Sequence, residues 1–296
     1  MTAAKKLPSR FPMPRPKTRP NRAPKARKHA PERTWLRPQS VVFTLLAEHV
    51  LDRDWAVFSG SFIDVLSRIG VGEHAVRSTL SRMTRRGLLE REKRGRKIYL
   101  RMTPRCIAVL EEGRRRIWEA GAVNVSLGER WTLLTFSLPD AWRRKRYDLR
   151  ARLGWSGFGP LQNGAWLAPA EVDVRPIVEH LGLTAHVRAF HIQPVAPTDA
   201  SSVIRETFDL DALAARYRAF IADWEPLSGQ AQPDALALTL RLSTQWLRII
   251  REDPRVPVHL LPADWPAMAA QRLFRLLHGA HREQSQTLAR ELLETI

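Results

Sequence analysis

The fold of this chain is decided by residues 59–103, which read SGSFIDVLSRIGVGEHAVRSTLSRMTRRGLLEREKRGRKIYLRMT. Its first part carries four apolar residues at the spacing of one helical face: Phe62, Val65, Leu66 and Ile69. Ser59 precedes them as an N-cap residue, and Gly70 and Gly72 then predict a tight turn. We therefore expect a short helix that ends in a turn.

A second helix is predicted from about residue 73 to residue 86. Its apolar positions, Val76, Leu80 and Met83, are spaced four and three residues apart and therefore share one face. Gly87 follows and ends the helix, as glycine commonly does just beyond a helix C-terminus. The opposite face is polar and basic and consists of His74, Arg77, Ser78, Ser81, Arg82 and Arg85.

A basic hairpin comes next. Leu89 alternates with charged neighbours, and Ile98 and Leu100 share one face of a second strand, which predicts two paired strands. The hairpin tip consists of Lys93, Arg94, Gly95, Arg96 and Lys97. Two helices, a turn and a basic hairpin in this order predict a winged helix-turn-helix, a module that inserts its second helix into the major groove of DNA.

The residue types on this surface suit double-stranded DNA. Arginine reads the O6 and N7 atoms of guanine in the major groove, whereas serine and lysine more often contact phosphates. A basic helix face by itself is also typical of solvated surface, but the turn, the glycine stop and the basic hairpin together favour nucleic-acid contact. We expect bases to be faced by Arg77, Ser78, Ser81 and Arg82, with His74 and Arg85 beside them. We expect the backbone or minor groove to be held by Lys93, Arg94, Arg96 and Lys97.

The formal net charge of +18 is unevenly distributed over the 296 residues. Residues 1–37 hold 12 Lys and Arg, one acidic residue and seven prolines, so this basic arm is predicted to be disordered. Two interpretations of the arm stay open, a phosphate or minor-groove contact and a dispensable tail. Residues 121–296 hold 20 basic and 19 acidic residues, which suits a DNA-binding front end on an ordinary globular body.

The apolar pattern of the whole chain predicts an α+β protein with three folded domains. One helix before the winged helix-turn-helix and a linker helix after it complete a domain over 38–120. Residues 121–200 follow the order β-α-β-β-α-β, with a turn at Gln162-Asn163-Gly164, which is the ferredoxin-like pattern. Residues 201–296 carry amphipathic helices and are expected to form a helical effector or dimerisation domain.

Cysteine usage and hydropathy predict a cytoplasmic protein. Cys106 is the only cysteine, so no intramolecular disulfide or cysteine-rich zinc site is expected, and a buried small hydrophobe is its best interpretation. A reducing compartment is the simplest fit. No apolar run reaches about 18 residues, and the first residues do not resemble a secretory signal, so no membrane contact is expected.

The sequence shows no catalytic signature. It contains no phosphate-binding glycine loop, no nucleophile elbow and no zinc-protease helix. His278 and His281 have the spacing to share a metal on a helix, but no carboxylate or cysteine accompanies them at ligand spacing. Ordinary structural histidines are the better interpretation, and no catalytic residue, metal site or cofactor is expected.

Three blocks of the sequence resemble the PaaX-type family of bacterial transcriptional regulators, the phenylacetate-operon repressors. The first reads AVRSTLSRMTRRGLLEREKRGRKIYLRMT (75–103), and the second reads WTLLTFSLP (131–139) followed by RRKRYDLRARLGWSGFGPLQNGAWLAP (143–169). The third reads PRVPVHLLPADWPAMAAQRLFRLLH (254–278). The resemblance covers about residues 38–296, and the basic arm falls outside it.

The resemblance implies a homodimeric repressor of an aromatic-compound catabolic operon of the phenylacetate type. Two subunits of such a regulator read an inverted-repeat operator, because symmetric dimers match symmetric sites. The resemblance also implies release from the operator by an acyl-CoA thioester such as phenylacetyl-CoA. Its domains are a winged helix, a ferredoxin-like domain similar to the small CRISPR-associated nuclease subunits, and a helical C-terminal domain.

An acyl-CoA effector needs cations for its phosphates and an apolar slot for its acyl group. The segment around Gly157 and Gly159 offers both kinds of group. The alternative is that its glycines serve a tight turn and its tryptophans a hydrophobic core. The candidate effector-binding residues are Arg150, Arg152, Trp155, Phe158, Trp166 and Arg175.

Two other functions stay open. The similarity of the central domain to nuclease subunits suggests a metal-dependent nuclease, but the predicted first strand, residues 131–137, lacks the aspartate that would hold the metal. The second alternative is a protein that compacts DNA without sequence preference, for which the basic arm would supply salt-sensitive affinity.

Overall fold

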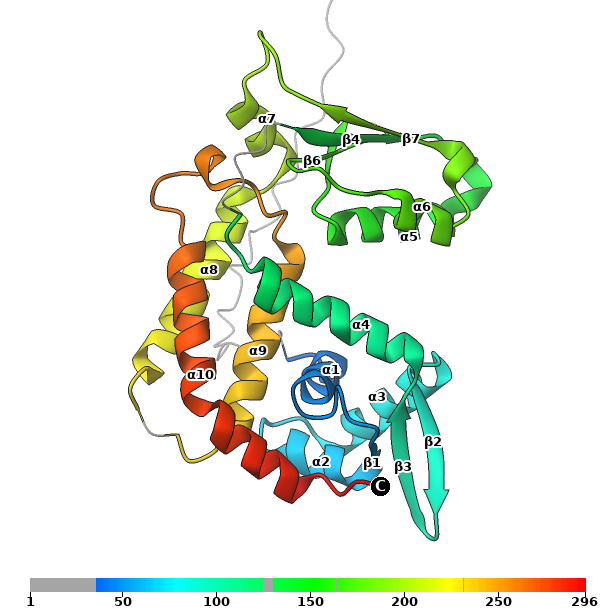
Figure 1. Ribbon diagram of the computed structural model, residues 1–296, viewed down its shortest axis with the longest axis vertical. Coiled ribbons are helices and arrows are strands. Elements are labelled where there is room, and N and C mark those ends of the chain that lie inside the picture. Colours follow the sequence, from blue (N-terminus) through cyan, green and yellow to red (C-terminus); the bar gives the residue numbers. More distant parts are fainter. Residues whose placement is uncertain (1–35, 125–129, 163, 231) are drawn as a thin grey trace, which may run out of the picture. The chain divides into compact units, whose positions relative to one another are not determined.

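The structure, a computed structural model, describes residues 36–124, 130–162, 164–230 and 232–296 (Figure 1). The predicted basic arm therefore lies outside the described residues, apart from Leu36 and Arg37. The described chain is a mixed α and β structure with two small antiparallel sheets and a helical last third. No helix in the described ranges is both long and apolar enough to cross a membrane.

The first region contains a three-stranded sheet with the order β1-β3-β2. Its helices and its hairpin lie where the apolar periodicity predicts them. The strand β1 has no counterpart among the predicted elements, because three residues are too few to show an alternating pattern. The elements are α1 (Pro38–His49), β1 (Ala56–Phe58), α2 (Ser59–Ser67), α3 (Glu73–Arg85), β2 (Leu89–Arg94), β3 (Lys97–Met102) and α4 (Pro104–Arg115).

Gly87 ends α3 in the predicted manner. Its φ of +65° lies in the left-handed region that favours glycine. The Gly87 N–H donates to the Thr84 carbonyl at 2.9 Å, and the Leu88 N–H donates to the Met83 carbonyl at 3.0 Å. This pair of bonds is a Schellman motif, and it turns the chain directly into β2. The predicted cap at Ser59 is wrong, because Ser59 is the first residue of α2 and Phe58 occupies the N-cap without a side-chain bond.

The second region contains a four-stranded antiparallel sheet with the order β5-β6-β4-β7. The helices α5 and α6 pack on one face of the sheet through Leu149, Leu153, Ile177 and Val178. Of the predicted turn, Gln162 ends β5 and Gly164 has a φ of +77°, whereas Asn163 lies outside the described residues. The elements are β4 (Trp131–Phe136), α5 (Arg143–Trp155), β5 (Gly159–Gln162), β6 (Ala165–Ala168), α6 (Arg175–His180) and β7 (Val187–Ile192).

The last region is helical and consists of α7 (Ala200–Thr207), α8 (Leu210–Trp224), α9 (Ala235–Glu252) and α10 (Ala267–Leu292). Three of these helices begin with an aspartate N-cap, whose carboxylate accepts a backbone N–H three residues on: Asp199, Asp209 and Asp234. An aromatic core joins α8, α9 and α10, with Trp246 stacked on Phe274 at a ring separation of 4.9 Å.

The hydrophobic core of the first region extends into the last one. Leu236 and Leu240 of α9 and Ala289 of α10 belong to the same buried cluster as the core residues of α1, α2 and α3. The Thr44 and Thr244 hydroxyls form a buried hydrogen bond of 2.9 Å between α1 and α9. Figure 1 shows α9 and α10 running beside α1 and α2. The last helices therefore complete the core around α1, α2 and α3.

We expect Leu240→Ala to lower the free energy of unfolding by about 2–5 kcal/mol, because Leu240 is fully buried in this shared core. Denaturant unfolding followed by circular dichroism measures the change. Leu276→Ala is the matched control, since Leu276 of α10 is 60% exposed and its removal should change stability by no more than about 0.5 kcal/mol. Separate unfolding of the helical region alone in Leu240→Ala would contradict a continuous core.

Candidate nucleic-acid interface and ligand cavity

The helix α3 separates an apolar face from a basic one. Val76, Leu80 and Met83 are buried in the core of the first region. The six polar residues predicted for DNA contact lie on the other side of the helix. His74, Arg77, Arg82 and Arg85 are exposed, and Ser78 and Ser81 are half-buried. Their helical spacing therefore brings all six residues onto one accessible surface of α3.

Two arginines on this surface are held by neighbours on the same helix. The Arg82 guanidinium donates to the Ser78 hydroxyl at 3.0 Å and to the Thr79 hydroxyl at 2.9 Å. Arg77 donates to the Glu73 carboxylate at 2.6 Å, one helical turn away. Both hydroxyls that hold Arg82 are uncharged, so Arg82 keeps its full positive charge in a restricted orientation. That combination suits the recognition of a base edge.

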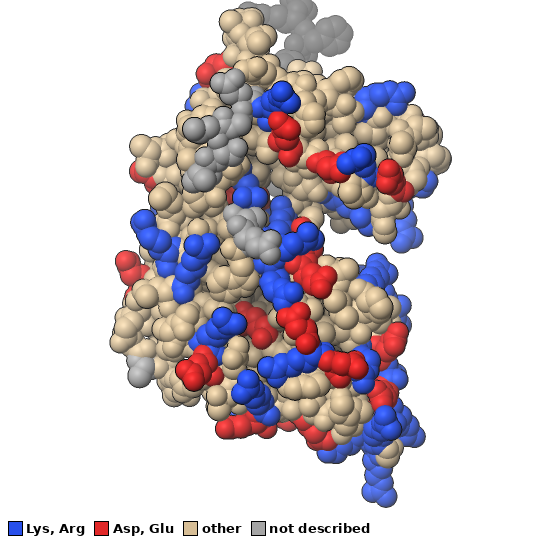
Figure 2. Space-filling view, in the orientation of Figure 1, with Lys and Arg blue, Asp and Glu red and all other residues tan. Residues whose placement is uncertain are grey.

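The β2–β3 hairpin presents four cations at its tip, which Figure 2 shows as a basic projection at the bottom of the view. Arg94 pairs with Glu92 at 2.6 Å, and this hydrogen bond holds the pKa of the Glu92 carboxyl below its ordinary value. Lys93 and Arg96 are exposed and form no ion pair within the described residues. The strands continue to Arg94 and Lys97, so only Gly95 and Arg96 form the turn.

The fourth hairpin cation, Lys97, is tied to residues 294–296, here called the tail segment. Lys97 Nζ lies 2.7 Å from a Glu294 carboxylate oxygen, and the Tyr99 hydroxyl donates to the same carboxylate. The backbone of the tail segment pairs with β1, with reciprocal hydrogen bonds of 3.0 Å between Ala56 and Ile296. The tail segment thus extends the sheet at its β1 edge, a contact across more than 190 residues that the sequence pattern does not indicate.

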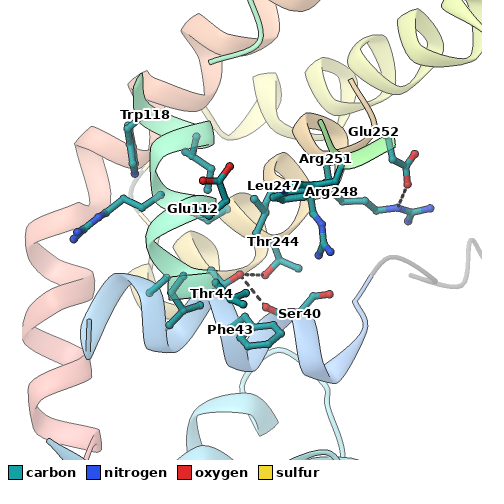
Figure 3. Close-up of a pocket in the computed structure, with 18 of the residues that line it drawn as sticks. Ser40, Phe43, Thr44, Glu112, Trp118, Thr244, Leu247, Arg248, Arg251 and Glu252 are labelled. Atoms are coloured by element: carbon teal, nitrogen blue, oxygen red, sulfur yellow. Dashed lines mark hydrogen bonds and ion pairs between the residues drawn. The ribbon is translucent and has the colours of Figure 1, made fainter. Parts of the chain in front are cut away.

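A cavity of about 1740 Å³ is the second candidate site. Figure 3 shows Ser40 and Phe43 of α1, Trp118 and Arg251 among the side chains that line it. Further lining residues come from α4, α5, α9 and α10. All three regions of the described chain therefore contribute to its lining. Its cations are Arg37, Arg105, Arg114, Arg152, Arg248, Arg251 and Arg282.

The cavity wall combines arginines with apolar and unpaired polar groups. The Trp155 ring contacts two guanidinium groups, with Arg116 at 4.2 Å and Arg251 at 4.9 Å from its ring centroid. Burial lowers the pKa of Arg251, which indicates that an anion beside it would be favourable. The buried hydroxyls of Thr207 and Ser243 have no hydrogen-bond partner within the described residues. A bound molecule with acceptor oxygens would satisfy such groups.

The structure divides the six candidate effector-binding residues into two groups. Arg152, Trp155 and Phe158 line the cavity. Arg150, Trp166 and Arg175 do not line it. Arg150 is exposed on α5 and Trp166 packs against the core between the second sheet and its helices. Arg175 pairs with Asp173 at 2.8 Å and, by this hydrogen bond, lowers the pKa of Asp173 to about 2.

The two histidines with metal-ligand spacing are both buried on α10. His278 lies 3.5 Å from the Glu48 carboxylate and edge-on to Trp118, whose ring centroid is 4.7 Å away. His281 is 9% exposed. The described residues hold no group of three or more His, Cys, Asp and Glu that could bind a metal ion. Cys106 is fully buried in α4, and this burial raises the pKa of its thiol to about 11.

We expect Glu294→Gln to lower the pKa of Tyr99 toward the ordinary tyrosine value, because the hydrogen bond to the Glu294 carboxylate raises it. A pH titration of phenolate absorbance measures this change. Glu291→Gln, at an exposed acid near the end of α10, is the control and should leave the titration unchanged. A Tyr99 titration that is identical in Glu294→Gln and in the unchanged protein would show that the tail segment does not hold the hairpin in solution.

The same link has a predictable dependence on pH. The hydrogen bond from Lys97 lowers the pKa of Glu294, so the folded state favours the carboxylate. Its contribution to stability is therefore present at neutral pH and is lost as the pH falls through that lowered pKa.

Comparison with known proteins covers most of the described chain. Residues 37–106 match the family described as PaaX-like protein, residues 124–204 match the PaaX protein central Cas2-like domain, and residues 208–291 match the PaaX-like protein C-terminal domain. A protein of Escherichia coli (strain K12) named Transcriptional repressor PaaX is 26% identical over an aligned length of 247 residues, and the match covers 79% of this chain and 77% of that protein.

A solved structure has the same overall fold. It is the uncharacterized protein Rv0674 from Mycobacterium tuberculosis, which matches 86% of this chain and 98% of its own with a TM-score of 0.56 and 21% sequence identity. The three family matches occur in chain order and together span nearly all of residues 37–291. The chain belongs to the PaaX family.

Proposed function

We propose that this protein is a cytoplasmic transcriptional repressor that binds double-stranded DNA through α3 and the β2–β3 hairpin. The observation that carries the proposal is the exposed basic face of α3, on which Ser78 and Thr79 hold the charged Arg82 side chain in place. The name of the E. coli relative supports the same function. Arg77, Ser78, Ser81 and Arg82 read bases, and the hairpin cations hold phosphates.

The arrangement of elements supports the finer fold assignment. The first region, with α2, the turn, α3 and the hairpin in succession, is a winged helix-turn-helix over residues 38–120. The second, over 121–200, has the order β-α-β-β-α-β and the sheet order β5-β6-β4-β7, which is the ferredoxin-like arrangement. The third, over 201–296, is the helical effector and dimerisation domain. Two subunits bind an inverted repeat, since one α3 reads only one half-site.

The effector is an anionic acyl-CoA thioester of the phenylacetyl-CoA type, and it binds in the cavity. Of the original candidates, Arg152, Trp155 and Phe158 carry this assignment, because they line the cavity. Arg248 and Arg251 add cations for the phosphates, and the unpaired hydroxyls of Thr207 and Ser243 add polar contacts. The regulated genes are those of an aromatic-compound catabolic operon.

The helix α10 links this cavity to the DNA-binding surface. His278, Arg282 and Ser285 line the cavity, and the chain that leaves α10 forms the tail segment against β1 and Lys97. A ligand that moves α10 therefore also moves the edge of the sheet that carries the hairpin. Such a coupling requires the ligand to favour one position of α10 over another.

Neither alternative function is favoured. A metal-dependent nuclease would need a carboxylate on the first strand of the second sheet, and β4 reads WTLLTF. A DNA-compacting protein would bind every sequence equally, and this outcome is part of the first test.

We expect the full chain to bind the DNA upstream of its own operon in a gel-shift experiment with competitor DNA, and phenylacetyl-CoA or a related thioester to release it. Specific binding follows from base contacts, which competitor DNA of other sequence does not satisfy. Equal retardation of every DNA fragment would reject the repressor and favour compaction.

We expect Arg82→Ala to lower affinity for that fragment by roughly tenfold or more, because a bidentate arginine–guanine contact contributes about 1–3 kcal/mol. Fluorescence anisotropy measures the affinity, and circular dichroism checks the fold. Arg275→Ala, at an exposed residue of α10, is the control with the same change of charge. Unchanged affinity in Arg82→Ala would remove α3 as the recognition helix.

We expect Arg152→Ala to weaken phenylacetyl-CoA binding by roughly tenfold, as the loss of one charge-assisted phosphate contact would. Isothermal titration calorimetry without DNA measures the affinity. Arg150→Ala is the matched control, because Arg150 is two residues away on the same helix and lies outside the cavity. Equal losses in both variants would count against the cavity.

A further inference from the structure

The outer face of α5 carries positive charge that neither the fold nor the ligand cavity uses. The helix reads RRKRYDLRARLGW and holds six cations and one acid, Asp148. Its buried residues are Leu149 and Leu153, which pack against the second sheet. Arg143, Tyr147 and Arg150 are spaced four and three residues apart, so they share one face of the helix. All three are exposed, and Tyr147 is exposed to 73%.

The cations of this face are not neutralised. Arg143, Arg144 and Arg150 form no ion pair within the described residues, whereas exposed arginines elsewhere, such as Arg68 and Arg216, lie against carboxylates. On the inward side of α5, Arg146 donates to the Leu138 carbonyl at 2.8 Å and Lys145 lies 4.2 Å from the Trp142 ring centroid. Figure 2 shows Lys and Arg along the lower edge of the lobe that carries α5.

This distribution of charge works against helix stability. The first turn of α5 contains Arg143, Arg144 and Lys145 and no acidic residue. Cations at a helix N-terminus are repelled by the partial positive charge of the macrodipole there. A large exposed aromatic side chain at Tyr147 contributes nothing to the core either. Cations at the helix N-terminus and an exposed aromatic side chain are both unfavourable for folding, and both occur on this helix. Their combination indicates selection for binding rather than for folding.

We propose that this face of α5 binds the phosphate backbone of duplex DNA, on the stretch that flanks the site held by α3. The inference rests on the proposed DNA-binding function. Arg143 and Arg150 are about 10 Å apart along the helix axis, which corresponds to roughly three phosphates of one strand. The Tyr147 hydroxyl between them donates to a phosphate oxygen, as tyrosine does at protein–DNA interfaces.

A short path through the structure joins α5 to the β2–β3 hairpin. Trp155, the last residue of α5, makes cation–π contacts with Arg116 and Arg251. Arg116 directly follows α4, and α4 begins two residues after the end of β3. The hairpin and α5 are thus connected through one helix and one cation–π contact. Arg152, which lines the ligand cavity, is two residues from Arg150 and lies outside the proposed DNA-binding face.

The test compares the full chain with Arg143→Ala/Arg150→Ala and with the control Arg272→Ala/Arg275→Ala, which removes two exposed cations from α10 instead. The probe is a long duplex of random sequence, and fluorescence anisotropy measures affinity over a series of salt concentrations. Each lost phosphate contact makes the slope of log affinity against log salt less steep by about 0.9. We therefore expect a change of about two in the α5 variant and little change in the control.

Further variants separate contact from folding. Arg143→Lys/Arg150→Lys keeps both charges and should restore most of the slope, and Tyr147→Phe should weaken binding without changing the slope. Thermal unfolding should be the same or higher in the alanine variant, since two cations leave an unfavourable position. A slope equal to that of the unchanged protein, or an equal loss in the α10 control, overturns the proposal. So does a loss of binding to RNA or to an acidic protein with none to the duplex.

The failure of the proposed function has a different signature. A chain that does not distinguish its upstream DNA from random DNA rejects the sequence-specific repressor. The contribution of α5 to DNA affinity is measured on the random duplex, so it can still be determined in that case.

Discussion

The structure depends on one packing constraint, the insertion of α9 and α10 into the core that α1, α2 and α3 begin. Leu236 and Leu240 are fully buried in that cluster, which also includes Ala289 of α10 and Leu293 directly after this helix. The helices of the first region therefore have no complete core of their own. Because dense interiors transmit displacement instead of absorbing it, a shift of α9 or α10 must be felt by the helices that position α3. A ligand that displaced the last region would therefore displace the first region through shared side chains, without a hinge.

The cavity follows from the same constraint. The cavity is lined by residues of α1, α4, α9 and α10, which contribute to the shared cores, and by residues of α5 from the second region. A molecule bound there would contact all three regions at once. The aromatic and cationic stack of Arg116, Trp155 and Arg251 lies where those regions meet. The position of the stack explains why charges there are partly desolvated, as the lowered pKa values of Arg116 and Arg251 show through burial.

The local sequence pattern predicted those structural features that depend on residues close together in the sequence. The period of Val76, Leu80 and Met83 set the orientation of α3, and Gly87 marked its end, because both effects act within one or two helical turns. The same reasoning could not find the pairing of residues 294–296 with β1, since no local signal in three residues reports a partner more than 230 positions away. For the cavity, one glycine-rich and aromatic segment gave three lining residues, Arg152, Trp155 and Phe158. The segment could not reveal Arg248 or Ser243, which the packing of α9 brings in from a distant part of the chain.

Acidic residues decide how much each predicted DNA contact contributes. Arg77, Arg94 and Lys97 already lie against Glu73, Glu92 and Glu294. When a phosphate approaches one of these cations, the cation exchanges a carboxylate for the phosphate, so the net electrostatic gain is small. The displaced carboxylate then repels the DNA backbone. Lys93 and Arg96 gain the full attraction, because no carboxylate lies against them within the described residues. In the proposed DNA complex, long-range attraction therefore comes from these two cations, whereas the paired cations favour only those geometries in which the phosphate displaces the carboxylate. The number of basic residues therefore overestimates the affinity that this surface would have for DNA. It underestimates how strongly the surface would select between binding geometries.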